Sequence, residues 1–400
     1  MLTMSILLWF GSFFGSETPK EEKIQPKTDP KVQVKLLLKG RVPAFFLDVK
    51  GEFEVVDLKN GRRQVKSYFP KKGTLQIKDG IKWVESFWGI HQIKVIPVQN
   101  DPVLVDGVEY FGNVEVISAD NLLHVINEVE VEDYVRSYMT QHFCDKPLNK
   151  TVLEAICVVV RTDVYHTLMR NRQSYFHLDA KKVGYQGASL RGLYPMIDRA
   201  IENTKHKVML FHGRPFPASW TEHSAGQTAS YKAVHRQNFE GPTGAYAPLA
   251  LQNKEDTRWS KEIPLEEITE RFGLSSLKKV DLFIDGNSEK VYAVRFFDRT
   301  KHVDVPITEL KNLLPSNLFK IDVTPHSLKV QGWGKGLGVG LCIYNATRLD
   351  AEGATLEEIL KSSFPQTTLE TRSTVPDLVA RVVDEEPTLW YAKKISAFND

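Results

Sequence analysis

Residues 126–143 read INEVEVEDYVRSYMTQHF, and inside this stretch the spacing of the apolar residues changes. Before Glu130 apolar and polar residues alternate, which is typical of a strand with one buried face. After Glu130 the apolar side chains recur with the spacing of one helix face. They are Val131, Tyr134, Val135 and Tyr138. The stretch therefore predicts a strand that runs directly into an amphipathic helix.

Further helices are predicted downstream. Residues 151–169 begin with TVLE, which has the spacing of an N-terminal capping box. The run AICVVV within them is apolar on every side, so we expect this helix to be buried. Another helix is expected at residues 194–204, and a last one begins at residues 355–358, where TLEE repeats the capping-box spacing.

Upstream of this switch the chain is strand-like. Segments such as VQVKLLL, AFFLDV and FEVVDL alternate, with Asn-Gly and Asp-Gly turns among them. The predicted fold class is α+β: a β-rich N-terminal region, then a mixed helix and strand core with a glycine-alternating strand and a capped C-terminal helix. The expected divisions are a signal-like segment and spacer (1–31), a β-rich lead region (32–127), a core (128–370) with a β-rich insertion at about 246–330, and a tail (371–400).

The composition is that of an ordinary soluble globular chain. Of 400 residues 42% are apolar and 26% are charged, which excludes a chain that is disordered throughout. The formal net charge of +2 gives no bulk electrostatic case for binding nucleic acid. No H-E-x-x-H spacing occurs, and we predict neither a metal site nor a cofactor. Cys144, Cys157 and Cys342 are either small buried side chains or supply one disulfide in an oxidising compartment.

The N-terminus favours export. Residues 6–14 (ILLWFGSFF) have the length of a signal-peptide core and are too short to span a bilayer, and a charged spacer follows at residues 17–31. No Lys or Arg precedes the apolar run, which a typical signal peptide would have. We expect an extracytoplasmic protein, periplasmic or associated with the envelope; the alternative is a cytosolic N-terminus.

Residues 332–340 read GWGKGLGVG, with a glycine at every second position. The spacing matches neither a Walker motif nor G-x-G-x-x-G. Period-two glycine removes the side chains from one face of a strand, so a ligand or another backbone can come close. Gly336 and Gly338 are therefore candidate substrate-binding positions, and tight internal packing is the alternative.

Residues 220–228 read WTEHSAGQT and combine an aromatic ring with polar side chains around a glycine. A carbohydrate site needs a ring for the apolar sugar face and donors and acceptors for the hydroxyl groups. The alternative is a polar turn with Trp220 in the core. The substrate-binding candidates of this loop are Trp220, His223, Ser224, Gln227 and Thr228.

Arg161 lies inside the apolar helix, where a charge needs a partner. A buried ion pair with a carboxylate such as Glu132 or Asp133 is the favoured interpretation. Direct contact of Arg161 with substrate is the alternative.

The motifs, taken in order, resemble the stage II sporulation protein D (SpoIID) and amidase-enhancer family. The resemblance covers about residues 40–370 and depends on the order of five motifs rather than on any one of them. They are residues 126–143, NKTVLEAICVVVRTDVY (149–165), HSAGQT (223–228), GLGVGLCIYNA (336–346) and TLEEILKSSFP (355–365). The resemblance implies action on bacterial peptidoglycan, because some members are lytic transglycosylases and others assist amidases.

The sequence departs from this family at its functional positions. The catalytic glutamate of the family aligns with His142, and the histidine of its G-H-G-V-G motif aligns with Leu337. Of the cysteine and histidine cluster that holds zinc in some members, only His177 and Asp179 remain in residues 176–187.

Two hypotheses follow from these departures. In the first, the protein cleaves glycan strands as a lytic transglycosylase and the acid has moved to a nearby carboxylate, with Glu222 favoured over Asp145. Glu222 and His142 are then the candidate catalytic residues. Burial between Trp220 and the glycine segment would raise the pKa of Glu222 and keep it protonated. In the second, catalysis is lost and the chain is a glycan-binding module that recruits or activates an amidase or another septal wall hydrolase. Both hypotheses make peptidoglycan glycan strands the partner.

Overall fold

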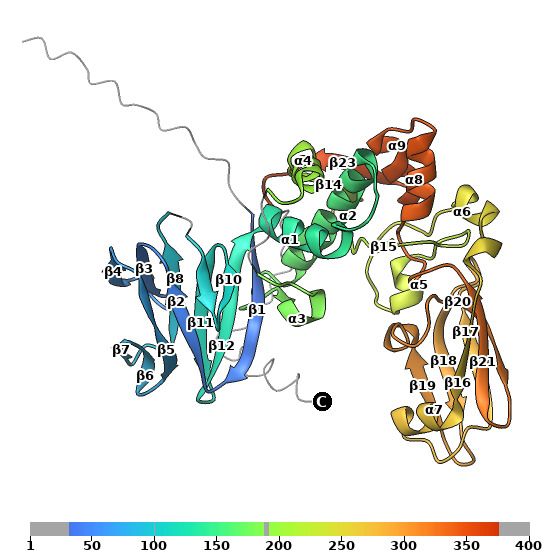
Figure 1. The fold of residues 1–400 in the computed structure, drawn as a ribbon, viewed down its shortest axis with the longest axis horizontal. Coiled ribbons are helices and arrows are strands. Elements are labelled where there is room, and N and C mark those ends of the chain that lie inside the picture. Colours follow the sequence, from blue (N-terminus) through green and yellow to red (C-terminus); the bar gives the residue numbers. More distant parts are fainter. Residues whose placement is uncertain (1–31, 100, 188–191, 376–400) are drawn as a thin grey trace, which may run out of the picture. The chain divides into compact units, whose positions relative to one another are not determined.

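The computed structural model describes residues 32–99, 101–187 and 192–375 (Figure 1). All of these residues belong to one compact unit. The expected signal-like segment lies outside the described residues, and so does the expected tail beyond residue 375. Within the described ranges, no helix has the length and apolar character needed to cross a bilayer.

The N-terminal region is built from strands, as the fold class predicts. They are β1 (Gln33–Val42), β2 (Ala44–Val49), β3 (Phe53–Asp57), β4 (Arg63–Ser67), β5 (Lys71–Ile77), β6 (Gly80–Trp83), β7 (Glu85–Trp88), β8 (Gln92–Pro97), β9 (Val103–Val105), β10 (Val108–Tyr110), β11 (Asn113–Ala119) and β12 (Leu122–Glu130). One sheet has the order β13-β1-β12-β11-β8-β3-β4, and the other β10-β9-β2-β5-β6-β7. The rings of Phe53 and Trp83, one from each sheet, lie 5.4 Å apart in the shared core.

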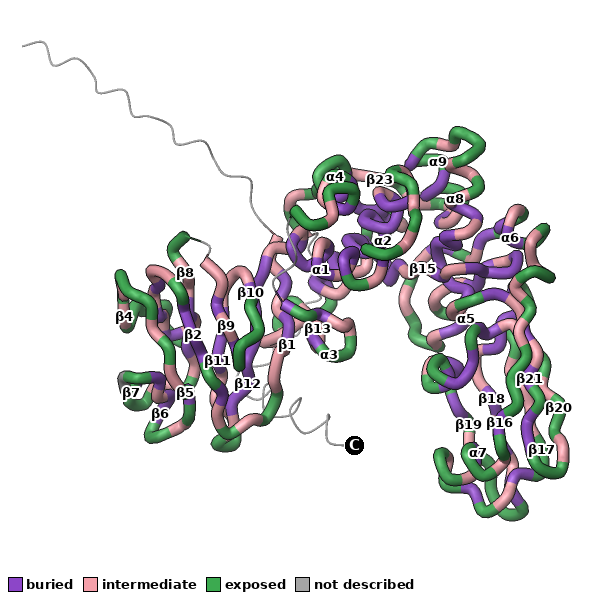
Figure 2. The backbone as a smooth tube through the Cα atoms, viewed as in Figure 1, coloured by how far each residue is buried: buried purple, intermediate pink, exposed green. Residues whose placement is uncertain are grey.

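The predicted switch from strand to helix is confirmed, because β12 ends at Glu130 and α1 begins at Val131. The helices are α1 (Val131–Phe143), α2 (Lys150–Arg170), α3 (Ala180–Val183), α4 (Pro195–Asn203), α5 (Tyr231–His235), α6 (Pro248–Gln252), α7 (Leu265–Phe272), α8 (Ile343–Ala351) and α9 (Leu356–Ser363). As expected, α2 is buried along most of its length (Figure 2).

Only one of the two predicted capping boxes forms. Thr355 and Glu358 make the reciprocal hydrogen bonds at the start of α9. The box predicted at Thr151 is wrong, since α2 begins one residue earlier and has no side-chain cap. The carboxylate of Glu154 is taken instead by the side chain of Asn203, which donates to it at 2.7 Å.

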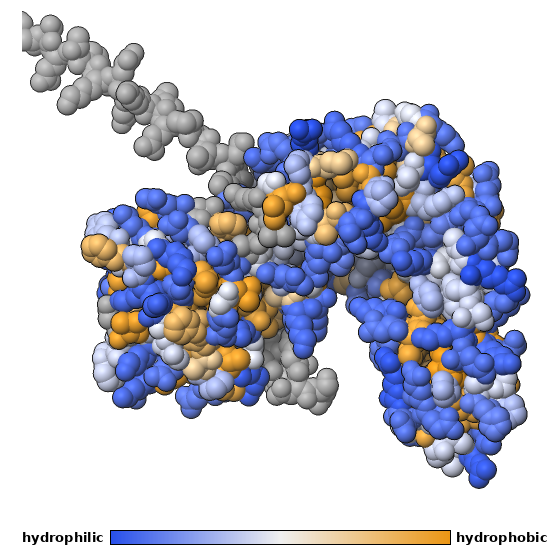
Figure 3. All heavy atoms as spheres, in the orientation of Figure 1, coloured by the Kyte–Doolittle hydropathy of each residue, from blue (hydrophilic) through white to orange (hydrophobic). Residues whose placement is uncertain are grey.

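The remaining strands follow α2. They are β13 (Leu178–Asp179), β14 (Lys207–Phe211), β15 (Trp220–Thr221), β16 (Trp259–Pro264), β17 (Lys279–Ile284), β18 (Val291–Phe297), β19 (His302–Pro306), β20 (Leu318–Val323), β21 (Ser327–Trp333), β22 (Leu341–Cys342) and β23 (Thr367–Thr371). Sheets β16-β21-β20 and β17-β18-β19 enclose a second apolar core. Polar side chains cover most of the face in Figure 3, with apolar patches between them.

The glycine segment is not a continuous strand. Strand β21 ends at Trp333, and Gly334, Gly336, Gly338 and Gly340 all have positive φ. A Cβ on Gly336 would lie 2.5 Å from Thr221 Oγ1, and one on Gly340 would lie 2.0 Å from the carbonyl oxygen of Ser219. These glycines therefore allow residues 219–225 to pack closely, which is the internal-packing alternative.

We predict that Gly340→Ala destabilises the fold far more than Gly213→Ala. Both glycines have φ +75°, so each alanine carries the same left-handed penalty of about 1–2 kcal/mol. A Cβ at Gly213 has nothing within 4 Å, whereas a Cβ at Gly340 clashes with backbone. Thermal unfolding of both variants checks this, and equal melting temperatures would contradict the close packing.

Candidate functional site

The C-terminal end of α1 carries an aromatic cluster formed by Tyr138, His142, Phe143 and Trp220. The Trp220 ring centroid lies 5.0 Å from that of Phe143 and 6.1 Å from that of His142. Its indole Nε1 donates to the Tyr138 hydroxyl at 3.0 Å, and the Tyr138 and His142 rings are 4.4 Å apart. Burial, with a contribution from the charge of Lys146, lowers the pKa of His142. His142 is therefore a neutral imidazole near pH 7.

Glu222 lies beside the aromatic cluster, but not as the protonated acid that the sequence predicts. Partial burial acts to raise its pKa, and hydrogen bonds and charge from Lys335 and Lys146 outweigh burial. The two ammonium groups lie 2.7 Å and 2.9 Å from its carboxylate oxygens. The pKa of Glu222 is thus lowered, and the predicted increase is wrong because two cations face the group. Glu222 is a carboxylate at neutral pH and has no proton to donate.

The loop that follows Glu222 is held by its own polar groups. The backbone of His223 exchanges two hydrogen bonds with Lys335, and His223 Nδ1 accepts from the Ala225 N–H. The Ser224 N–H donates to Cys342 Sγ at 3.3 Å, and the Ser224 carbonyl oxygen accepts from Lys290 Nζ at 2.5 Å. The Ser224 hydroxyl donates to the Gly226 carbonyl oxygen at 2.8 Å, so the buried side chains of His223 and Ser224 both hold the loop.

Thr228 also stabilises the loop. Its buried hydroxyl donates to the Ala245 carbonyl oxygen and accepts from the Ala245 N–H. Gln227 is half-buried. At Gly338 an added Cβ would lie 2.7 Å from Lys290 Cε. The Lys290 side chain therefore fills the space that we predicted to be open to a ligand. The structure brings His142, Trp220 and Glu222 together, and it gives Ser224, Thr228 and Gly338 internal partners.

Arg161 is fully buried and forms an ion pair. Its Nη2 and Nε donate to the Glu132 carboxylate at 2.7 Å and 2.9 Å, and Nη1 donates to the Lys207 carbonyl oxygen at 3.1 Å. The favoured ion-pair interpretation is confirmed. Direct contact of Arg161 with substrate does not fit, because no part of this side chain reaches the surface.

The structure places the three cysteines and the two residues that remain of the family's zinc cluster as follows. Cys144 is exposed and Cys157 and Cys342 are buried, all three as free thiols. His177 Nδ1 accepts from the Lys35 N–H, and the Asp179 carboxylate caps α3, so both residues have structural roles. No group of three metal-ligating side chains occurs in the part of the chain that is described.

Asp163 is a titratable residue that the sequence reasoning passed over. It lies on α2, two residues after Arg161, with the N–H of Ala218 donating toward its carboxylate. Burial raises its pKa to about 7, against the effect of that hydrogen bond. A carboxyl residue directly beside an Arg-Thr pair inside an apolar helix was the available signal.

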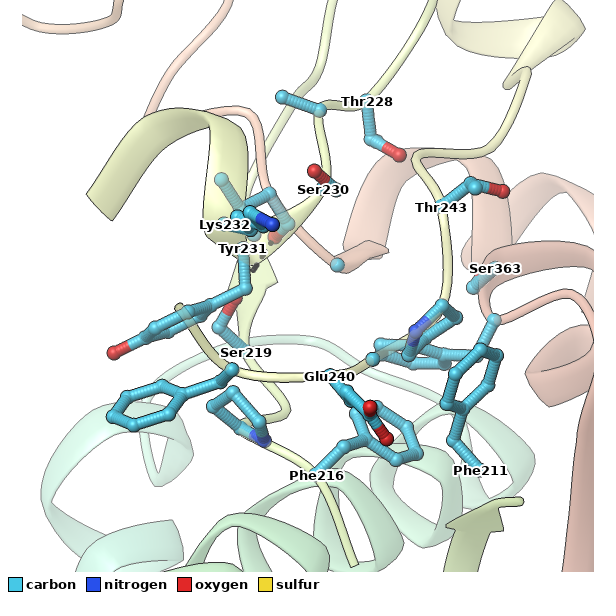
Figure 4. A pocket seen from close by; sticks show the side chains of 18 of the residues that line it. Phe211, Phe216, Ser219, Thr228, Ser230, Tyr231, Lys232, Glu240, Thr243 and Ser363 are labelled. Carbon is cyan, nitrogen blue, oxygen red and sulfur yellow. Dashed lines mark hydrogen bonds between the residues drawn. The ribbon is translucent and has the colours of Figure 1, made fainter. Parts of the chain in front are cut away.

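A pocket of about 420 Å³ is lined in part by the residues on either side of Ala218 (Figure 4). Aromatic rings and polar groups share its wall, including Phe216, Ser219, Tyr231, Phe239, Glu240 and Phe364. Pro217 and Ser219 flank the Ala218 N–H that faces Asp163. Among the predicted site residues in the described ranges, only Thr228 lines this pocket.

We predict that Glu132→Gln costs about 3–5 kcal/mol of stability, because the Arg161 guanidinium would remain buried without its counter-charge. Asp304→Asn is the control, since its ion pair with Arg295 is exposed. Such pairs contribute at most about 1 kcal/mol. Denaturant unfolding measures both, and equal losses would show that burial of the Arg161 pair has no special effect.

We predict a pH-dependent gain of stability from Asp163→Asn. The folded protein keeps the Asp163 proton up to about pH 7, whereas an unfolded aspartate loses it near pH 4. Wild-type stability therefore falls between about pH 4 and 7 by about 1.4 kcal/mol per pH unit relative to the variant, and the difference is constant above that. Melting temperatures of both proteins across this range test it. A difference that does not change with pH would contradict the raised pKa.

A comparison with protein families finds a match near the middle of the chain. Residues 119–211 match the family model SpoIID, stage II sporulation protein. The matched range extends from the last residue of β11 through α1, α2 and α4 to the end of β14. It contains His142, Arg161 and Asp163, and it ends before Trp220.

Three similar proteins extend this comparison. An uncharacterized protein of Chlamydia pneumoniae is 32% identical over 134 residues, which are 33% of this chain and 49% of that protein. One of Chlamydia muridarum is 27% identical over 186 residues, covering 46% of this chain and 63% of its own length. One of Brachyspira hyodysenteriae is 22% identical over 328 residues, covering 79% and 87%. This chain thus spans about half to two thirds of the two chlamydial relatives.

The family match confirms over residues 119–211 the resemblance that the order of motifs predicted. Residues 119–211 are therefore similar to a SpoIID domain, which points to a family related to sporulation and the cell wall.

Proposed function

We propose that this protein binds the glycan strands of peptidoglycan at the aromatic cluster and works on the cell wall outside the cytoplasm. The single observation that carries the proposal is the position of Trp220 at the end of α1, with the Glu222 carboxylate and two lysines around it. The SpoIID domain supports the cell wall as the place of action.

The chemistry of the aromatic cluster suits an amino sugar. Trp220 is half-buried, so its ring combines a fixed position with some exposed surface for the apolar face of a sugar. The side chains of Lys146, Glu222 and Lys335 are 32%, 31% and 65% exposed, and they offer donors and acceptors beside that ring. A few polar groups around an apolar surface are what orients a ligand in a binding site.

Binding is better supported at this cluster than bond cleavage. A glycosidase acid must hold a proton near neutral pH. Neither Glu222 nor His142 does so, because their pKa values are both lowered. A binding module of this kind would bring an amidase or another septal wall hydrolase to the strand. Cleavage by the protein itself is the second candidate function, and Asp163 is the observation that favours it.

We predict that Trp220→Ala weakens binding to glycan strands at least about tenfold, because loss of a central aromatic contact typically costs about 2 kcal/mol or more. Co-sedimentation with purified sacculi and titration with soluble strands measure the affinity. Trp88→Ala is the matched control, since Trp88 is an exposed tryptophan of the β7 strand and should leave the affinity unchanged.

Because Trp220 also packs on Phe143, melting temperatures must show that the variant is folded. Saturable binding that only Trp220→Ala weakens supports the proposed function. If the wild type does not bind strands, or if both variants bind as tightly as the wild type, the proposal is wrong.

A further inference from the structure

The pocket of about 420 Å³ combines buried aromatic rings with two charges of opposite sign (Figure 4). The rings of Phe216 and Phe364 are buried in its lining, with their centroids 5.7 Å apart. Lys232 and Glu240 also line the pocket, and both are exposed. Within the described ranges, neither of these two side chains forms an ion pair or a hydrogen bond. Both charges are therefore available to a ligand.

The segment that carries Glu240 is anchored on both sides. Before it, the ring of Phe239 is covered by the Arg170 guanidinium, which lies 3.9 Å from the ring centre. After it, the backbone at Gly244 comes so close to Thr228 that an added Cβ would lie 1.9 Å from the Thr228 carbonyl oxygen. Because the segment is already ordered, little conformational entropy is lost when Glu240 binds a ligand.

The segment that carries Lys232 is anchored in a different way. The Ala229 N–H donates to the Gly338 carbonyl oxygen at 2.8 Å. The Ser230 hydroxyl oxygen accepts from the Ala233 N–H at 3.2 Å and so caps the short helix α5, on which Lys232 lies. The ammonium and carboxylate groups of the pocket thus belong to two segments that are held independently of each other.

The chemistry of the pocket indicates a ligand that is both charged and partly apolar. Its volume is within the usual range for a ligand site, and few polar groups accompany the aromatic rings. A neutral sugar would leave both charges unused. A nucleotide or a phosphate would pair with Lys232 but would be repelled by Glu240. A short peptide that carries a carboxylate, an ammonium group and small apolar side chains satisfies all parts of the lining.

The pocket and the aromatic cluster are adjacent along the chain. Ser219 and Gly340 line the pocket, and the residues that follow them, Trp220 and Leu341, are paired in the sheet of β15 and β22. In peptidoglycan, peptides branch from the amino sugars of the strand. About four extended residues span about 13 Å, so a peptide attached to a sugar at Trp220 is long enough to enter the pocket.

We propose that this pocket binds the stem peptide of a peptidoglycan strand whose sugars bind at the aromatic cluster, an inference that rests on the proposed function. Lys232 binds the terminal carboxylate of the peptide, and Glu240 binds the ammonium group of its diamino acid. The methyl groups of its alanines contact the rings of Phe216 and Phe364. A cross-link turns that ammonium group into an amide, so the pocket selects peptides that are not cross-linked.

The test titrates the full chain with soluble tetrapeptide stems in a calorimeter. We expect Lys232→Gln and Glu240→Gln each to weaken binding about threefold to fivefold, as for a partly exposed ion pair. Amidation of the peptide's terminal carboxylate should weaken binding to the wild type and to Glu240→Gln, but not further to Lys232→Gln. Acetylation of the diamino acid should show the opposite dependence on the two variants.

Lys311→Gln and Glu267→Gln are the matched controls, because both residues are exposed and lie outside the pocket. Losses that follow the charges of the peptide, with unchanged melting temperatures and unaffected controls, support the assignment. It is overturned if the wild type does not bind the peptide, or if the charge of the peptide has the same effect on every variant.

Glycan strands freed of stem peptides separate this inference from the proposed function. They should bind the wild type, Lys232→Gln and Glu240→Gln equally, since they contact only the aromatic cluster. Binding of these strands without binding of the peptide overturns the pocket assignment and leaves the proposed function standing. Binding of the peptide without binding of the strands supports the pocket as a peptide site and overturns the proposed glycan site.

Discussion

The buried ion pair between Arg161 and Glu132 is the interaction on which the arrangement of α1, α2 and β14 depends. It joins the first turn of α1 to the middle of α2, and its further hydrogen bonds reach the Lys207 carbonyl oxygen and the His206 N–H. Three elements are thereby fixed in one register. Both the aromatic cluster at the end of α1 and Asp163, half a turn beyond Arg161, take their places from this contact.

The sequence predicted what depends on local periodicity and on single-residue chemistry. The change of period at Glu130, the buried helix α2 and the capping box at Thr355 are set by neighbours within a few residues. The pKa of Glu222 was not predictable in this way, because its two lysines come from positions 146 and 335. The predicted capping box at the start of α2 was wrong for the same reason. The side chain of Asn203, which is distant in the sequence, forms the hydrogen bond with Glu154 that the capping box would need.

The glycine segment shows how one pattern serves two purposes. Alternating glycines could expose a ligand surface or admit a neighbouring chain, and composition does not separate these. In the structure the space beside Gly336 and Gly340 is filled by the Thr221 side chain and the Ser219 backbone. The glycines of the segment therefore shape the loop that carries Trp220 and Glu222, and the segment's contribution to the proposed site is the side chain of Lys335. Binding chemistry is left to side chains that three separated parts of the chain contribute.

Lys290 has a consequence for the history and the engineering of this chain. It directly precedes Val291 of the second apolar core, and its ammonium group is buried against the Ser224 carbonyl oxygen of the loop. Burial lowers its pKa to about 8. Removing the strands around Lys290 would leave that carbonyl without its donor and open a void beside Gly338. The strands around Lys290 therefore cannot be removed without destabilising the loop at Ser224. A design that transplants the loop must also include these strands.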